Sequence, residues 1–160
     1  MSSKQKPVLT ASDKFEFSEE ADALAKQILS AKDESLSDAG IFSFKIIIVD
    51  RKSWRDYAGL CWKQSPIHKF LLDTDFLILI KKDYWLESKF DEKAKLLIHE
   101  LHHIASRPLS KSDKENRTAP KPATRRHAGD FCEIPEHDMY SIQTLDRIRK
   151  KMGWKSTIEN

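Results

Sequence analysis

The chain has 160 residues, of which 39% are hydrophobic and 33% charged, and its 28 basic and 25 acidic residues give a net charge of +3. This length suits one domain, no apolar run approaches the roughly 18 residues that cross a bilayer, and the charge is too balanced to identify a nucleic-acid-binding protein. The polar N-terminus argues against a signal peptide, and Cys61 and Cys132 cannot form a disulfide framework or a four-cysteine zinc site, so we expect a cytoplasmic protein with reduced cysteines and no membrane partner.

The first predicted elements follow a polar N-terminal tail, residues 1–15. Ser18 is placed as a helix N-cap before acidic residues, and apolar residues at helical spacing continue to Ala31. Three short segments rich in β-branched and aromatic residues come next, and we predict strands over residues 42–49, 57–62 and 76–80. Their short connections predict a small, mostly antiparallel three-stranded sheet.

A second helix and a long loop follow the strands. Asp91 is placed as the N-cap of a helix over residues 91–106, one side of which is apolar. Beyond it, residues 106–135 are rich in basic and small polar residues. A continuous helix is excluded there by three prolines, Pro108, Pro120 and Pro122.

The last predicted helix begins at His137 or Asp138 and continues to Lys151, with Gly153 as its stop signal. Together these elements predict an α+β fold. Its single domain covers residues 16–154 and a short tail, 155–160, follows it.

The predicted helix over 91–106 contains an HExxH pattern, formed by His99, Glu100 and His103. Two histidines four residues apart have Cβ atoms roughly 5 to 6 Å apart on one helix face, which suits two imidazole nitrogens each about 2.0 Å from one zinc ion. Glu100 lies beside such a metal and can accept a proton from a water molecule as a general base. His102 points about 100° away from His103, so we expect it behind the ligands or at the surface.

Catalytic zinc usually has three protein ligands and one open position, so a third ligand should lie downstream. His137 is the preferred candidate, because it begins an amphipathic helix that would hold a ligand rigidly. His127 is the alternative, because His127 and Phe131 could form one turn of helix. A carboxylate, Asp130 or Asp138, is a further possibility.

The chain resembles the phage metallopeptidase family, small HExxH zincins that are similar in layout to SprT-like proteases. The resemblance rests on residues 69–80, which lead into the motif helix, and on His137-Asp138 with the helix that ends at Met152-Gly153-Trp154. It covers about residues 42–154. It implies a helix, a small sheet and an active-site helix, with zinc held by His99, His103 and His137.

One departure from the family concerns the third ligand. The loop 106–135 looks long for the family, and residues 125–131 are similar to the His-Gly-x-x-Phe element that supplies the third ligand in SprT-like proteins. This similarity keeps His127 as the alternative to His137.

These observations predict a zinc-dependent metallopeptidase that hydrolyses protein or peptide substrates, with Glu100 as general base, in the host cytoplasm if it is phage-encoded. The strand 76–80, if it lies at a sheet edge, could bind an extended peptide by strand addition. Tyr140 is a weak candidate for an oxyanion donor. The alternative functions are a zinc-stabilised binding module without catalysis and, with weaker support, nucleic-acid contact through the basic loop 107–126.

Overall fold

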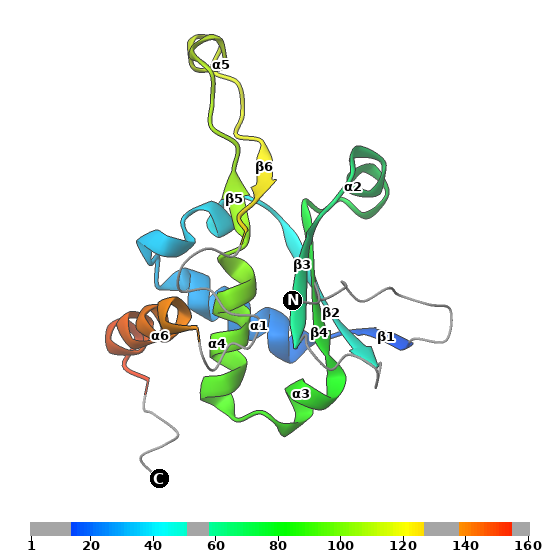
Figure 1. Cartoon of the computed structure of the whole chain (residues 1–160), viewed down its shortest axis with the longest axis vertical. Coiled ribbons are helices and arrows are strands. Elements are labelled where there is room, and N and C mark those ends of the chain that lie inside the picture. Colours follow the sequence, from blue (N-terminus) through cyan, green and yellow to red (C-terminus); the bar gives the residue numbers. More distant parts are fainter. Residues whose placement is uncertain (1–13, 51–57, 127–137, 155–160) are drawn as a thin grey trace, which may run out of the picture.

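A computed structural model of the chain describes residues 14–50, 58–126 and 138–154, and a four-stranded sheet runs through it (Figure 1). The strand order is β1-β2-β4-β3, with bounds of Lys14–Phe17 for β1, Phe44–Asp50 for β2, Gly59–Lys63 for β3 and Phe76–Lys81 for β4. β1 pairs antiparallel with β2 and β3 pairs antiparallel with β4, whereas β2 and β4 are parallel. The α+β class is confirmed, and the sheet is antiparallel in two of its three pairings.

The three predicted strands are present as β2, β3 and β4. β1 is a fourth strand that sequence patterns did not predict, and it begins inside the segment expected to be a tail. All four of its residues are exposed, so no alternation of buried and exposed side chains marks it as a strand. It depends instead on main-chain pairing with β2.

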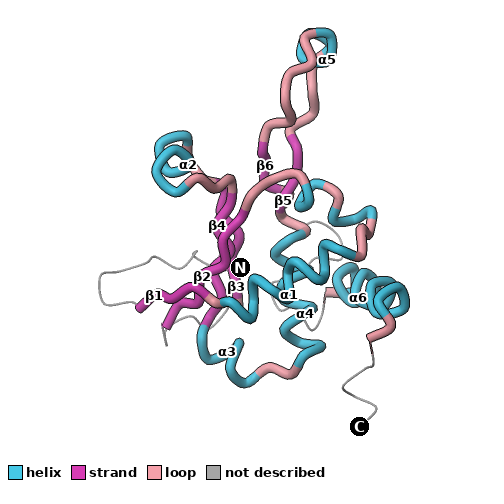
Figure 2. Tube along the Cα trace, turned by 180° about the vertical axis from the view of Figure 1, so that it is seen from behind, coloured by secondary structure: helices cyan, strands magenta, loops and turns pink. Residues whose placement is uncertain are grey.

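Helices α1 (Glu19–Ser30) and α4 (Phe90–Leu101) pack on the sheet, and α6 (Met139–Met152) packs against α4 farther from the strands (Figures 1 and 2). Alternate strand residues such as Ile46, Ile48 and Ile78 face the helices and join the main core. A smaller apolar cluster occupies the opposite side of the sheet and contains Ile47, Val49, Leu60, Trp62 and Leu79. The motif helix α4 is therefore the central element of the fold.

The ends of the first and last helices match the predictions. Ser18 caps α1 by accepting a hydrogen bond from the main-chain N–H of Ala21. Asp138 caps α6. Gly153, with φ of +69°, ends that helix in the left-handed conformation that glycine adopts without strain.

The ends of α4 differ from the prediction. It begins after Lys89, whose main-chain N–H donates to the side chain of Glu92, and not at Asp91. It ends at Leu101 and not at residue 106, because the last turn tightens and the His103 N–H donates to the carbonyl of Glu100. The next residues leave as strand β5 (Ile104–Ser106).

The segment predicted to be a long loop has structure of its own. β5 pairs antiparallel with β6 (Pro122–Thr124), and the short helix α5 (Lys111–Glu115) lies between them. The segment projects from the body with α5 at its far end (Figures 1 and 2). We call residues 104–124 the arm.

Four short helices complete the described fold. The 3-10 helices η1 (Glu34–Leu36) and η2 (Asp38–Gly40) join α1 to β2, and α3 (Lys82–Glu87) follows β4. α2 (Pro66–Leu72) joins β3 to β4 and has no buried residue. Even its Phe70 is 85% exposed. None of the helices in the described ranges is long and apolar enough to cross a membrane.

Candidate functional site

The three residues of the motif lie at the C-terminal end of α4. His99 and Glu100 are in its last turn and are 1% and 2% exposed, because Leu97, Ile98 and Leu101 bury the same part of the helix. His103 is half-buried just past the helix end. The ring centroids of His99 and His103 are 5.1 Å apart. The two imidazoles are thus neighbours, as their spacing predicts, although the helix ends between them.

The imidazole of His99 is oriented by Asp138. Nδ1 of His99 lies 2.8 Å from Oδ2 of Asp138, and both side chains are buried. An ionised carboxylate only accepts hydrogen bonds, so Nδ1 must carry the hydrogen, and in the neutral ring the lone pair is then on Nε2. Burial raises the pKa of Asp138, but hydrogen bonds from His99 and Ser141 outweigh it and hold the pKa below its ordinary value. The carboxylate is therefore charged and fixes the tautomer.

The imidazole of His103 is oriented in the same way by the main chain. Its Nδ1 lies 2.7 Å from the carbonyl oxygen of Arg125, which can only accept. The N–H of Arg125 donates to the carbonyl of His103 at 2.8 Å, and its guanidinium donates to the carbonyl of His102 at 2.8 Å. Both motif histidines are thus held as the tautomer whose Nε2 is the acceptor, which is the form that binds a metal through Nε2.

Glu100 is a buried carboxylate without full hydrogen bonding. Its Oε1 is 4.0 Å from Nε2 of His99, too far for a hydrogen bond, and among the described residues its Oε2 has no hydrogen-bond partner. Burial raises the pKa of Glu100 to about 7, although His99 acts in the opposite direction. A buried acceptor of this kind indicates a water molecule or an ion as its partner.

The carboxylate of Glu100 also lies against the first residue of β3. A Cβ built on Gly59 would be 3.2 Å from Oε1 of Glu100 and 3.1 Å from the main-chain oxygen of Leu79. Gly59 therefore leaves the space that this carboxylate needs. Sequence patterns give no indication of the contact, because the two residues are distant in the chain.

His102 is buried and supports the site from behind, so its predicted alternative position at the surface is wrong. Its exposure is 0%, its ring packs on Tyr140 with centroids 4.5 Å apart, and its Nδ1 is 3.4 Å from the hydroxyl of Ser141. Burial lowers the pKa of His102 to about 3, so the ring is neutral. Because the Ser141 hydroxyl also donates to Asp138, His102 packs behind the carboxylate that orients His99.

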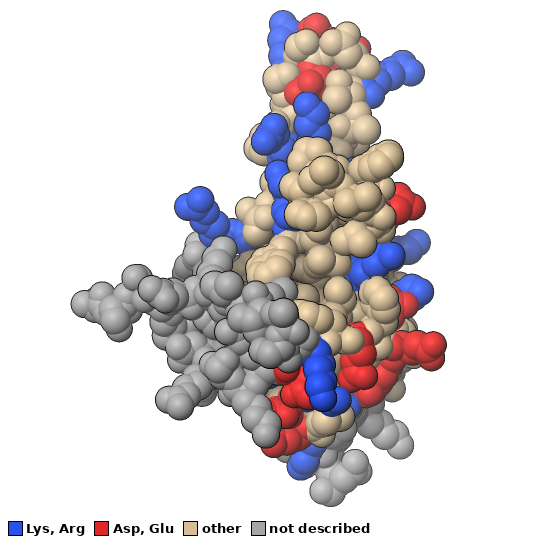
Figure 3. Space-filling view, turned by 90° about the vertical axis from the view of Figure 1, so that its right-hand side faces the viewer, with Lys and Arg blue, Asp and Glu red and all other residues tan. Residues whose placement is uncertain are grey.

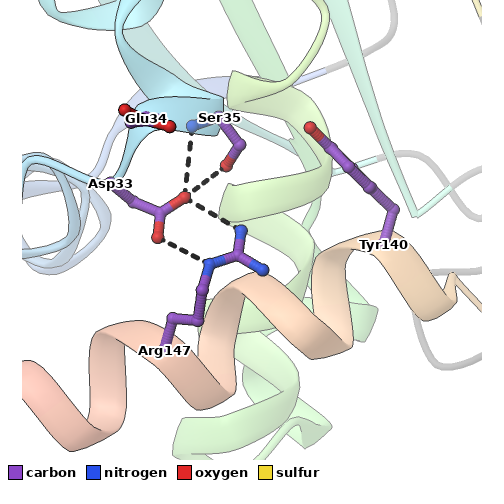
Figure 4. Close-up of a pocket in the computed structure, with 5 residues that line it drawn as sticks. All are labelled: Asp33, Glu34, Ser35, Tyr140 and Arg147. Carbon is purple, nitrogen blue, oxygen red and sulfur yellow. Dashed lines mark hydrogen bonds and ion pairs between the residues drawn. The ribbon is translucent and has the colours of Figure 1, made fainter.

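Tyr140 faces a different region from the motif. It lines a pocket of about 460 Å³ together with Asp33, Glu34, Ser35 and Arg147 (Figure 4). Neither the motif histidines nor Glu100 line this pocket. Its position gives no support to a role as an oxyanion donor.

Of the four candidates for the third ligand, the structure describes only Asp138. His127, Asp130 and His137 lie outside the described residues. Asp138 contacts Nδ1 of His99 and not Nε2, which is the position of a supporting carboxylate and not of a ligand. Within the described ranges, no group of three histidine, cysteine or acidic side chains is arranged to hold a metal.

The described residues supply some of the groups that would bind a divalent cation. Two imidazoles present Nε2 as an acceptor, and Oε2 of the buried Glu100 beside them has no hydrogen-bond partner in the described part of the chain. Burial and the nearby charge of Glu100 raise the pKa of Cys61 well above its ordinary value, which favours its neutral thiol. The chemistry of this site is therefore that of nitrogen ligands and a carboxylate.

Two neighbouring imidazoles at the end of a helix, with a buried glutamate after the first, are typical of metal-dependent peptidases. The chain matches the model of the family described as "Putative phage metallopeptidase" over residues 13–153, and it belongs to that family. No curated protein and no solved structure matches the chain. The family match therefore supports the class of metallopeptidase.

Proposed function

We propose that the chain is a zinc-dependent peptidase in which His99 and His103 bind the metal and Glu100 is the general base. The observation that carries this proposal is the shared tautomer of the two histidines, each of which donates from Nδ1 to a fixed acceptor. Neutral imidazole nitrogens are common zinc ligands in catalytic sites. His137 is the proposed third ligand, with His127 as the alternative.

The proposed chemistry divides between the metal and Glu100. Bound zinc would supply a Lewis acid that lowers the pKa of a water molecule toward about 7 and polarises a scissile carbonyl. The carboxylate of Glu100 accepts the proton of the attacking water and then returns it to the leaving amine. A nearby cation favours the charged form of this buried carboxylate, and so compensates the burial that raises its pKa in the metal-free chain.

The substrate position involves β3 and not β4. The strand 76–80 does not have the edge position on which its predicted peptide binding depends, because β4 is paired on both sides, with β2 and β3. β3 is the last strand of the four-stranded order and begins at Gly59, against the carboxylate of Glu100. An extended peptide that adds to β3 would bring its main chain close to the proposed base.

The experiment that tests this proposal is Glu100→Gln with zinc content measured in parallel. We expect the variant to retain zinc, because both imidazoles are unchanged, and to lose peptide hydrolysis by a factor of about 10² to 10⁴. Glu87→Gln, which changes an exposed glutamate of α3, should keep both properties. Hydrolysis at the wild-type rate by zinc-loaded Glu100→Gln would refute the assignment of the base, and a zinc-loaded wild type that cleaves no peptide would favour the binding module.

A further inference from the structure

The arm carries the entire net charge of the chain. Residues 104–124 contain five basic and two acidic residues, and the rest of the chain is balanced with 23 of each. The five basic residues are all exposed and are Arg107, Lys111, Lys114, Arg117 and Lys121. On the face seen in Figure 3, Lys and Arg side chains lie at the tip and along the sides of the projecting arm, with Asp and Glu side chains also at the tip, and side chains of both charges lie on the body.

The basic side chains of the arm do not hold the described part of the fold together. None of the five forms an ion pair with a described residue. The carboxylate of Asp113 is occupied by the N–H and hydroxyl of Ser110. By contrast, Arg125, just beyond the arm, donates to Asp38 and to the carbonyl of His102. The charges of the arm therefore remain exposed to a partner.

The arm projects from the core, and only its base is buried. Ile104 at its base is 1% exposed, but α5 at the tip has no buried residue. β5 and β6 form a two-stranded ribbon, and Arg107 extends its ladder by donating to the carbonyl of Lys121 at 2.8 Å. A two-stranded ribbon is narrow enough to enter the major groove of a B-form DNA duplex, which is about 12 Å wide.

The composition of the arm indicates which part of a nucleic acid it would contact. Residues 104–124 contain no aromatic residue, so the aromatic stacking that typically holds unpaired bases is not available. Lysine and arginine side chains contact phosphates without regard to sequence. Leu109 is the single large apolar residue of the arm outside the buried base, whereas a membrane-binding segment needs an apolar face.

We propose that the arm binds double-stranded DNA through the phosphate backbone, without sequence preference. The binding is electrostatic, involves up to five phosphates and does not require the peptidase activity. β6 at the base of the arm lies close to β3, so a bound duplex would lie on the same side of the molecule as the strand proposed to take the peptide.

Fluorescence anisotropy with a labelled DNA duplex of mixed sequence, measured at several salt concentrations, tests this proposal. Five phosphate contacts give a slope of about −4.5 for log K against log salt, or a loss of affinity of about 500-fold between 50 and 200 mM. The triple variant Lys111→Gln, Lys114→Gln, Arg117→Gln should reduce the slope to about −1.8. Its folding can be checked by circular dichroism, since the three side chains are exposed.

The matched control is Lys32→Gln, Lys150→Gln, Lys151→Gln, which removes the same charge from exposed positions outside the arm and outside β3. It should keep the wild-type slope. Equal loss of binding in both triple variants would overturn the proposal, because net charge and not the arm would then be responsible. So would the absence of duplex binding at 50 mM salt, or arm-dependent binding to phosphatidylserine vesicles without binding to the duplex.

Discussion

Replacing Asp138 with asparagine tests whether this carboxylate orients His99 for a metal. Oδ1 of Asp138 accepts from the main-chain N–H groups of Tyr140 and Ser141, and Oδ2 accepts from Nδ1 of His99 and from the hydroxyl of Ser141. Both oxygens act only as acceptors. An asparagine side chain has one oxygen and one amide nitrogen, so one of these two sets of bonds must be lost.

The expected magnitude follows from the two orientations of the amide. If the nitrogen replaces Oδ2, it faces His99 as a donor and favours the other tautomer, in which Nε2 carries the hydrogen. Loss of such a supporting bond lowers metal affinity by about 10- to 100-fold, or roughly 1.4 to 2.7 kcal/mol. If the nitrogen replaces Oδ1, it faces two main-chain donors and the cap of α6 is lost, at about 1 to 2 kcal/mol of folding stability.

Two measurements distinguish these orientations. Competition with a chromogenic chelator gives the zinc affinity of Asp138→Asn, and thermal unfolding of the chelator-treated protein gives its stability without metal. Asp146→Asn is the control, because it removes an exposed charge from the same helix. If Asp138→Asn leaves both zinc affinity and metal-free stability unchanged, the reasoning from the tautomer is refuted.

Two further predictions concern packing and pH. Gly59→Ala places a methyl group 3.2 Å from Oε1 of Glu100; we expect about 1 to 2 kcal/mol of destabilisation and reduced peptidase activity, and Gly40→Ala, with nothing within 4 Å, should change neither. A fully active, equally stable Gly59→Ala would show that this contact is unimportant. Hydrogen bonds from Arg147 lower the pKa of Asp33 from 3.8 to about 2, so this pair stabilises the fold above about pH 4 and the contribution is lost as the pH falls toward 2. Because Arg147 is half exposed, urea unfolding should show Asp33→Asn less stable by about 1 kcal/mol at pH 7, and a difference that stays constant down to pH 2 would contradict the ion pair as its cause.

Local sequence patterns predict the helix ends and strands that depend on residues close together in the chain. The helices α1 and α6 begin and end close to the predicted residues, because an N-cap such as Ser18 and a stop such as Gly153 act within one turn. The strands β2, β3 and β4 follow from short runs of β-branched and aromatic residues. The predicted end of α4, residue 106, is wrong. The apolar spacing of the helix continues through Ile104, but that residue pairs in β5.

Local sequence patterns are enough to predict the α+β class. They also contain the HExxH spacing, and the ligand and base assignments that rest on this spacing remain predictions. The tertiary structure alone decided the parallel pairing of β2 with β4 and the exposed strand β1, because strand pairing joins residues far apart in the chain. It also decided what orients the two motif histidines. The partners of His99 and His103 are a carboxylate 39 residues away and a carbonyl 22 residues away. No local pattern specifies these contacts, because they depend on the packing of α6 against α4 and on the return of the chain to His103 at Arg125.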